Sequence, residues 1–218
     1  MSSKNLFEFD KSFNKTVIGT DEAGRGPGAG GVFAAAVYFP EVTESLIEDL
    51  AILNDSKKLT KKRRESIYDT ILRNTINKIV CVEVEEIEKI NILNASLKAM
   101  NVACTEIAKG MAKENILTLI DGNELIRGNY PYPQKFIVKG DSKSASIAAA
   151  SILAKVARDR YMEELHEKYP MYNWKKNAGY LTKEHMEAID KYGLTPYHRR
   201  VFLRKHFEAG RQLNLLEG

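Results

Sequence analysis

Short apolar segments alternate with longer helical ones, and this alternation most constrains how the chain can fold. Runs of apolar and β-branched residues predict strands at 16–20, 30–39, 78–85, 116–120 and 135–138. Helical apolar spacing predicts helices at 60–74, 92–113 and 144–168. Strands come first and then alternate with helices, so the sequence predicts an α/β fold in which helices flank a mixed sheet.

A change of pattern after Tyr169 indicates a second region. Short helical segments there are interrupted by glycine and proline, at Pro170, Gly179, Gly193 and Pro196. We therefore predict a core domain over 1–168 and a helical C-terminal region over 169–218 that packs on it. No stretch approaches the roughly 20 apolar residues that a membrane span needs, and the start of the chain is polar. A cytoplasmic protein without a membrane partner is expected.

The charge of the chain is unevenly distributed, although the net charge is only +4. Residues 79–124 hold four lysines and arginines against eight acidic residues, whereas residues 175–211 hold nine against four. This asymmetry favours a basic face beside an acidic centre, as in proteins that bind nucleic acid. Charge alone does not exclude the alternative, in which the two segments form solvated helix faces that bind no partner.

Four acidic residues follow three of the predicted strands. Asp21 and Glu22 precede a glycine-rich segment, and Asp121 and Asp141 each follow a later strand. Neighbouring side chains on a straight strand point to opposite faces, so Asp21 and Glu22 can share a site only if the backbone turns there. Singly, each acid fits a turn or a helix cap equally well.

Together, these carboxylates would repel one another unless cations neutralise them. Oxygen ligands favour Mg²⁺ or Mn²⁺ over Zn²⁺, and two such ions form the usual arrangement for phosphodiester hydrolysis. The sequence therefore makes a two-ion hydrolytic site plausible, but it does not show that the acids converge.

Five sequence blocks carry a family resemblance that extends from Val17 to Phe202. They are GTDEAGRGP at 19–27, NDSKKLT at 54–60, INILNAS at 90–96, the segment from Lys139-Gly140-Asp141 to Asp159-Arg160, and GYLTKEH at 179–185 followed by TPYHRR at 195–200. In these blocks the chain resembles the type 2 ribonuclease H family, specifically bacterial ribonuclease HII.

The resemblance implies a ribonuclease H-like sheet and a monomeric endonuclease dependent on Mg²⁺ or Mn²⁺. Such an enzyme cleaves RNA in RNA–DNA hybrids and acts in ribonucleotide excision repair. It cuts on the 5′ side of ribonucleotides embedded in DNA and leaves 3′-hydroxyl and 5′-phosphate ends. By position, the catalytic metal ligands are Asp21, Glu22, Asp121 and Asp141.

Substrate contacts are also implied. Gly24, Arg25 and Gly26 match the loop that contacts the ribonucleotide's 2′-hydroxyl, and Tyr180 matches the aromatic residue that stacks on the sugar at the RNA-to-DNA junction. Cationic side chains are expected to contact phosphates without reading the base sequence: Lys57, Lys58, Lys143, Arg199 and Arg200.

The tail from Gln212 to Leu216 is similar to the short peptide with which bacterial repair proteins bind the sliding clamp. Packing of its leucines on their own domain is the alternative.

Two departures from the family pattern stand out. Gly28 replaces the leucine of the usual Pro-Leu-Ala-Gly-Pro, and Leu181 replaces the second glycine of Gly-Tyr-Gly-Thr. Gly28 is expected to loosen its turn, and Leu181 removes the conformational freedom of a glycine beside Tyr180.

Two alternatives to ribonuclease HII are a ribonuclease HIII-like activity on longer hybrids and a non-catalytic nucleic-acid-binding module on the same fold. The first normally carries an extra N-terminal domain, whereas only some fifteen residues precede the first predicted strand here. The complete set of acids argues against the second.

Overall fold

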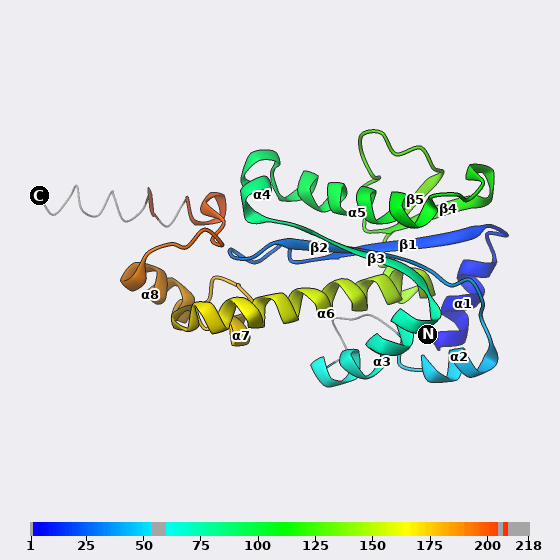
Figure 1. Ribbon diagram of the computed structural model, residues 1–218, viewed down its shortest axis with the longest axis horizontal. Coiled ribbons are helices and arrows are strands. Elements are labelled where there is room, and N and C mark those ends of the chain that lie inside the picture. Colours follow the sequence, from blue (N-terminus) through cyan, green and yellow to red (C-terminus); the bar gives the residue numbers. More distant parts are fainter. Residues whose placement is uncertain (1, 54–59, 205–206, 209–218) are drawn as a thin grey trace, which may run out of the picture.

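A five-stranded mixed sheet forms the middle layer of the fold (Figure 1). The computed structural model describes residues 2–53, 60–204 and 207–208. Along the sheet the strands lie in the order β3 (Ile76–Val82), β2 (Val32–Tyr38), β1 (Thr16–Ala23), β4 (Ile116–Asp121) and β5 (Gln134–Ile137). Strand β2 is antiparallel to both of its neighbours, β3 and β1, while β1, β4 and β5 run parallel to one another. The carboxyl ends of β1, β4 and β5 therefore meet at one edge.

Helices cover both faces of this sheet (Figure 1). One face carries α4 (Val84–Ile90) and α5 (Ile92–Ala108), and the other carries α6 (Ala145–Lys168) with α1 (Ser3–Lys11), α2 (Glu44–Asp49) and α3 (Lys61–Asn74). Beyond α6 follow α7 (Trp174–Asn177) and α8 (Lys183–Tyr192). The short 3-10 helices are η1 (Lys113–Asn115), η2 (Gly140–Ser142) and η3 (Pro170–Tyr172).

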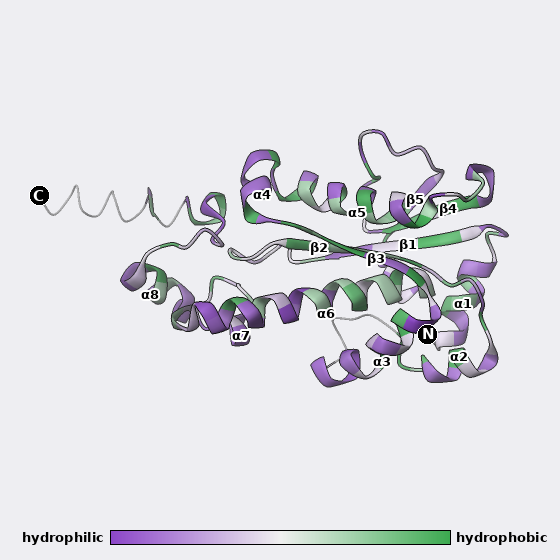
Figure 2. Ribbon diagram, in the orientation of Figure 1, coloured by the Kyte–Doolittle hydropathy of each residue, from purple (hydrophilic) through white to green (hydrophobic). Residues whose placement is uncertain are grey.

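Strand β2 shows how the sequence divides the core between the two faces. Ala34 and Ala36 pack in the cluster that contains α5, whereas Ala35 and Val37 pack in the cluster that contains α6. This alternation follows from the two-residue period of a strand. The part of α6 that lies over the sheet is hydrophobic, and the part that continues toward α7 is largely hydrophilic (Figure 2). The first part of α6 thus packs on the sheet, and its last part packs on the C-terminal region.

Gly19 of β1 sets how closely α6 approaches the sheet. A Cβ atom at Gly19 would lie 2.2 Å from the carbonyl carbon of Ser146 and 2.3 Å from the backbone nitrogen of Ile147. Asp10 of α1 holds the same end of α6, because its Oδ2 accepts a hydrogen bond of 2.8 Å from the backbone N–H of Ser146. The first turn of α6 therefore lies directly against β1.

The structure confirms the predicted fold class, a mixed sheet flanked by helices with a helical C-terminal region. All five predicted strands and all three predicted helices are present, with shifted ends. The expected helix at 92–113 ends at Ala108, and the expected strand at 78–85 ends at Val82 because α4 begins at Val84. Helix α1 was not predicted, although Leu6 and Phe7 bury its apolar face.

The C-terminal region packs on the end of α6. Met162 and Leu165 of α6 share a hydrophobic cluster with Trp174 and Ile189. Helix α6 ends at Lys168, where the sequence pattern changes. The division into regions 1–168 and 169–218 stays a prediction. Within the described residues, no helix is both long enough and apolar enough to cross a membrane.

Candidate active site

Three of the four predicted acids lie where the parallel strands end. Asp21 and Asp121 each follow the paired residues Thr20 and Ile120 of β1 and β4, so they lie at the same level of adjacent strands. Asp141 lies in η2, which follows β5. The backbone N–H of Gly140 donates a hydrogen bond of 2.6 Å to Oδ1 of Asp121, which ties η2 to the end of β4. The fold thus brings the three segments to one edge of the sheet.

Asp21 is the most deeply buried of these acids. Its side chain lies in the interior of the protein, and the residue is 3% exposed. Burial, followed by the negative charges of Glu22 and Asp121, raises the pKa of the Asp21 carboxyl well above its usual range. Hydrogen bonds from the Ser151 side chain and the Glu22 backbone N–H act in the opposite direction. Asp21, Glu22 and Asp121 are therefore close enough to repel one another.

This donor set is suited to a hard divalent cation, because carboxylate oxygens are the ligands that such ions prefer and a cation would relieve the repulsion. Within the described part of the chain, however, no three His, Cys, Asp or Glu side chains form a preassembled metal-binding group. Asp21, Glu22, Asp121 and Asp141 could hold an ion by their chemistry.

The backbone turns after the pair of acids and not between them. Strand β1 stays paired with β2 through Ala23, and the backbone leaves the strand only at Gly24, where φ is +100°. The turn begins after Glu22, at the first of the loop glycines, and the negative charge of Glu22 still reaches Asp21. Glu22 is half-buried, and its Oε1 accepts a hydrogen bond of 3.3 Å from Nη1 of Arg25.

Two buried arginines hold the loop that follows β1. Arg199 donates from Nε to the carbonyl of Gly30 (2.8 Å) and from Nη1 to the carbonyl of Pro27 (2.9 Å). Arg158 of α6 donates to the carbonyls of Ala29 (3.1 Å) and Ala178 (3.0 Å). Burial, followed by the neighbouring charge of Arg158, lowers the pKa of Arg199 to about 9. The two guanidinium groups bind the loop from inside the protein.

The predicted phosphate contact of Arg199 is therefore corrected. Arg199 is 0% exposed, so its guanidinium cannot reach a nucleic acid on the surface. Its neighbour Arg200 is exposed, and Lys143 is half-buried just after η2. Lys57, Lys58 and the segment from Gln212 to Leu216 lie outside the described residues.

Tyr180 lies against the loop of Gly24, Arg25 and Gly26. A Cβ atom at Gly26 would lie 3.3 Å from Cε1 of the Tyr180 ring. The two segments are also joined by a hydrogen bond of 3.0 Å from the N–H of Gly28 to the carbonyl of Gly179. Tyr180 is 53% exposed, so much of its ring faces solvent beside the loop.

The two departures from the family pattern contact each other. A Cβ atom at Gly28 would lie 2.5 Å from Cδ2 and 2.6 Å from Cγ of Leu181. The leucine missing at position 28 is thus matched by a leucine at position 181, which fills the same space from the opposite segment. This contact indicates a compensating exchange between the two positions.

A double-mutant cycle tests this exchange. Gly28→Leu is expected to lower the free energy of unfolding by about 1–3 kcal/mol through overpacking. Leu181→Gly is expected to lower it by about 1–2 kcal/mol, because it leaves a cavity and frees the backbone. The double variant should lose clearly less than the sum, as measured by urea unfolding. Strictly additive losses would show that the two positions are independent.

Ser151 and Arg158 were not identified from the sequence. They lie seven residues apart on α6, hence on one face of the helix. Two polar residues at that spacing within an otherwise apolar helix were the sequence signal that could have identified them.

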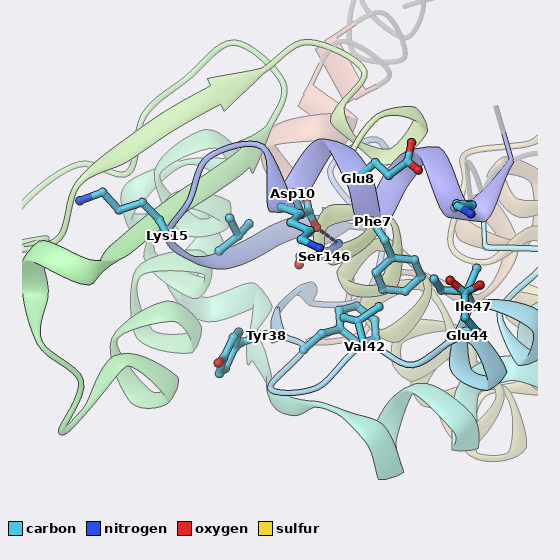
Figure 3. Close-up of a pocket in the computed structure, with 13 residues that line it drawn as sticks. Phe7, Glu8, Asp10, Lys15, Tyr38, Val42, Glu44, Ile47 and Ser146 are labelled. Atoms are coloured by element: carbon cyan, nitrogen blue, oxygen red, sulfur yellow. Dashed lines mark hydrogen bonds between the residues drawn. The ribbon is translucent and has the colours of Figure 1, made fainter.

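A cavity of about 320 Å³ lies away from the acids (Figure 3). Its lining includes Phe7, Asp10 and Tyr38, together with Val17 near the start of β1. Asp21 lies near the other end of that strand. This cavity is therefore not part of the candidate active site.

Comparison with known proteins agrees with the motifs. The family model described as ribonuclease HII matches residues 18–209. The chain is 50% identical over 205 residues to the ribonuclease HII of Fusobacterium nucleatum subsp. nucleatum, covering 94% of this chain and 93% of that protein. It is 49% identical to the ribonuclease HII of Caldanaerobacter subterraneus subsp. tengcongensis, covering 93% of this chain and 78% of that protein.

Solved structures share the fold. The ribonuclease H2 of Pyrococcus horikoshii superposes with a TM-score of 0.64 at 27% identity and covers 85% of this chain and 93% of that chain. A PCNA:RNase HII complex from Archaeoglobus fulgidus superposes with a TM-score of 0.67 at 24% identity and covers 84% of this chain and 93% of that chain. Bst-RNase HIII in complex with Mn²⁺ superposes with a TM-score of 0.62 at 20% identity and covers 88% of this chain and 65% of that chain.

The family match spans residues 18–209, a range that contains the acids, the glycine loop and Tyr180, and the two relatives match over 93–94% of the chain. The chain therefore belongs to the ribonuclease HII family of type 2 ribonuclease H endonucleases.

Proposed function

We propose that this enzyme cleaves RNA in RNA–DNA hybrids and nicks duplex DNA on the 5′ side of an embedded ribonucleotide. It would leave 3′-hydroxyl and 5′-phosphate ends and so begin ribonucleotide excision repair. The observation that carries the proposal is the contact between Tyr180 and Gly26, on a loop that begins directly after the strand of Asp21 and Glu22. A nucleotide held by that loop would have its phosphodiester near the acids.

Recognition of the ribose requires close approach of the backbone, because only the 2′-hydroxyl distinguishes RNA from DNA at a single nucleotide. Gly26 has no Cβ atom beside the Tyr180 ring, whereas the missing Cβ atom of Gly24 leaves room for the guanidinium of Arg158. Arg25 extends an exposed cation between the two glycines. The partly exposed ring of Tyr180 supplies a flat apolar surface on which a sugar could stack. We propose that Gly24, Arg25, Gly26 and Tyr180 together select the ribonucleotide.

We propose that Asp21, Glu22, Asp121 and Asp141 bind the Mg²⁺ or Mn²⁺ on which cleavage depends. When bound, two such ions would activate a water molecule and stabilise the leaving oxygen. The repulsion that raises the pKa of Asp21 supports this assignment, since a divalent cation would offset it. An Mn²⁺ complex is known for the structurally similar Bst-RNase HIII. Ser151 and the N–H of Gly140 would orient Asp21 and Asp121.

The proposed activity is tested with three labelled duplexes: one with a single ribonucleotide, one of DNA alone and one long RNA–DNA hybrid. Each is incubated with Mg²⁺ and then with Mn²⁺. We expect a single nick 5′ of the lone ribonucleotide and no cleavage of the DNA duplex. Cleavage of the DNA duplex would refute ribose recognition. Cleavage of the long hybrid alone would favour a ribonuclease HIII-like activity, and binding without cleavage would indicate a non-catalytic module.

Phosphate contacts by exposed cations predict binding that depends on salt. Arg200→Ala is expected to weaken binding of hybrid and DNA duplexes equally, and to reduce the slope of log affinity against log salt by about 1. Lys109→Ala, on the exposed end of α5, is the matched control. Fluorescence anisotropy between low and moderate salt measures both slopes. An unchanged slope for the Arg200 variant would remove it from the nucleic-acid interface.

We also propose a monomeric cytoplasmic enzyme that docks on the sliding clamp through Gln212 to Leu216. The structurally similar archaeal ribonuclease HII forms a complex with PCNA, which supports a clamp contact of this kind. Deleting residues 212–218 should abolish clamp binding in calorimetry and leave cleavage unchanged. Unchanged clamp binding would eliminate the proposed contact.

A further inference from the structure

Two histidines face each other in the interior of the C-terminal region. His185 of α8 is 0% exposed and His198 is 2% exposed. Their Nε2 atoms lie 3.1 Å apart, and Nε1 of Trp174 lies 3.0 Å from Nε2 of His185. A buried pair of this kind is stable only if each contact has one donor and one acceptor.

The partners of the two rings define which nitrogen carries the proton. Nδ1 of His185 lies 2.9 Å from the carbonyl oxygen of Tyr180, which can only accept, so His185 is protonated at Nδ1. Nδ1 of His198 receives the backbone N–H of Thr195 at 2.9 Å, so His198 is protonated at Nε2. His198 then donates to His185, and Trp174 donates to the same nitrogen. When both rings are neutral, each contact has one donor and one acceptor, and the lone pair of Nε2 of His185 is shared between its two donors.

Burial favours this neutral state. It lowers the pKa of His185 and lowers that of His198 to about 4. The rings are enclosed by Tyr172 and Trp174, whose centroids lie 4.7–6.1 Å from the histidine rings. His185 therefore keeps a fixed N–H directed at Tyr180.

The Tyr180 ring depends on its backbone for its position. The ring is largely exposed, whereas its peptide groups are held by hydrogen bonds on both sides. Its N–H donates to the carbonyl of Asn177 at 2.9 Å, and its carbonyl accepts from the N–H of Thr182 at 2.8 Å and from His185. Of these three contacts, the one from His185 is the side-chain contact that connects the turn to the interior.

We propose that His185 is a positioning residue for Tyr180, and that His198 and Trp174 fix the ring of His185 so that it can serve this purpose. The inference rests on the proposed role of Tyr180 at the ribonucleotide. It assigns no proton transfer to either histidine, and both act through the tyrosine backbone.

Two replacements of His185 separate positioning from simple packing. In His185→Asn the amide can replace Nδ1 and keep the bond to the Tyr180 carbonyl, whereas in His185→Gln it replaces Nε2 and loses that bond. We expect the Gln variant to lose about tenfold in kcat/KM on the single-ribonucleotide duplex, because small misplacements of a substrate-positioning group are costly. The Asn variant should stay within about threefold of the wild type.

The same replacements are then made in a Tyr180→Ala background, where we expect His185→Gln to cause less than about a twofold further loss. Equal losses for Asn and Gln, or an undiminished loss in the Tyr180→Ala background, would overturn the inference. If Tyr180→Ala alone leaves cleavage unchanged, the proposed role of Tyr180 fails instead, and the positioning role fails with it.

A measurement on the wild type does not depend on how the variants fold. Nitrogen-15 NMR should show His185 protonated at Nδ1 and His198 protonated at Nε2 at neutral pH. The opposite tautomer of His185 would contradict the proposed bond to Tyr180.

Discussion

Asp21→Asn is expected to lower cleavage of an RNA–DNA hybrid by about 10³-fold or more, because it removes a charged ligand of the proposed metal site. Hybrid affinity should stay within about twofold, since phosphate contacts and not Asp21 are proposed to hold the duplex. Single-turnover cleavage and anisotropy measure the two effects. An active variant would refute the assignment of Asp21 as a metal ligand.

The same substitution should stabilise the metal-free protein at neutral pH. The pKa of Asp21 is raised in the folded state, so the folded state binds this proton more tightly than the unfolded chain does. The stability that this group contributes is full below its unfolded pKa of about 4 and is lost as pH rises through the raised folded value. Asparagine carries no charge and avoids this loss.

Urea unfolding in the presence of a chelator measures whether Asp21→Asn raises or lowers the stability of the protein. Asp21→Asn should be more stable than the wild type at pH 8, and the difference should shrink toward pH 4. The exposed Asp49→Asn on α2 is the control and should change little. Equal stability of wild type and Asp21→Asn at pH 8 would contradict the raised pKa.

Gly19→Ala is expected to be the most destabilising of the substitutions considered. The added methyl group would lie within 2.3 Å of the backbone of Ser146 and Ile147, which no side-chain rotation can relieve. Helix α6 must move away from β1, at a cost of about 3 kcal/mol. In a chain of this size that cost lowers Tm by roughly 6–12 °C.

Gly26→Ala is a matched control for Gly19→Ala. Its new methyl group would meet only the exposed ring of Tyr180, so we expect a change in stability below about 1 kcal/mol. Cleavage at a single ribonucleotide should nevertheless fall, because the methyl group would stand between the loop and the substrate. A wild-type Tm for Gly19→Ala would show that α6 does not lie as close to β1 as described.

The positions of the strands and of the acids at their ends could be predicted from the sequence, because both follow from local hydrophobic periodicity. The position of Arg199 could not. A cation in a basic segment predicts a surface contact, whereas its burial depends on loop carbonyls about 170 residues earlier in the chain. The exchange between Gly28 and Leu181 was hidden for the same reason. Each change looks disruptive in its own segment, and only the contact between the segments shows the compensation.

Manganese binding shows whether the carboxylates at the ends of β1 and β4 form the metal site. Mn²⁺ is titrated into the wild type and into Asp21→Asn, Asp121→Asn and Asp49→Asn, and free Mn²⁺ is followed by electron paramagnetic resonance. We expect the wild type and the Asp49 variant to bind the ion equally, and the Asp21 and Asp121 variants to lose at least about tenfold in affinity. Equal binding by all four proteins would show that the carboxylates at the ends of β1 and β4 do not form the metal site.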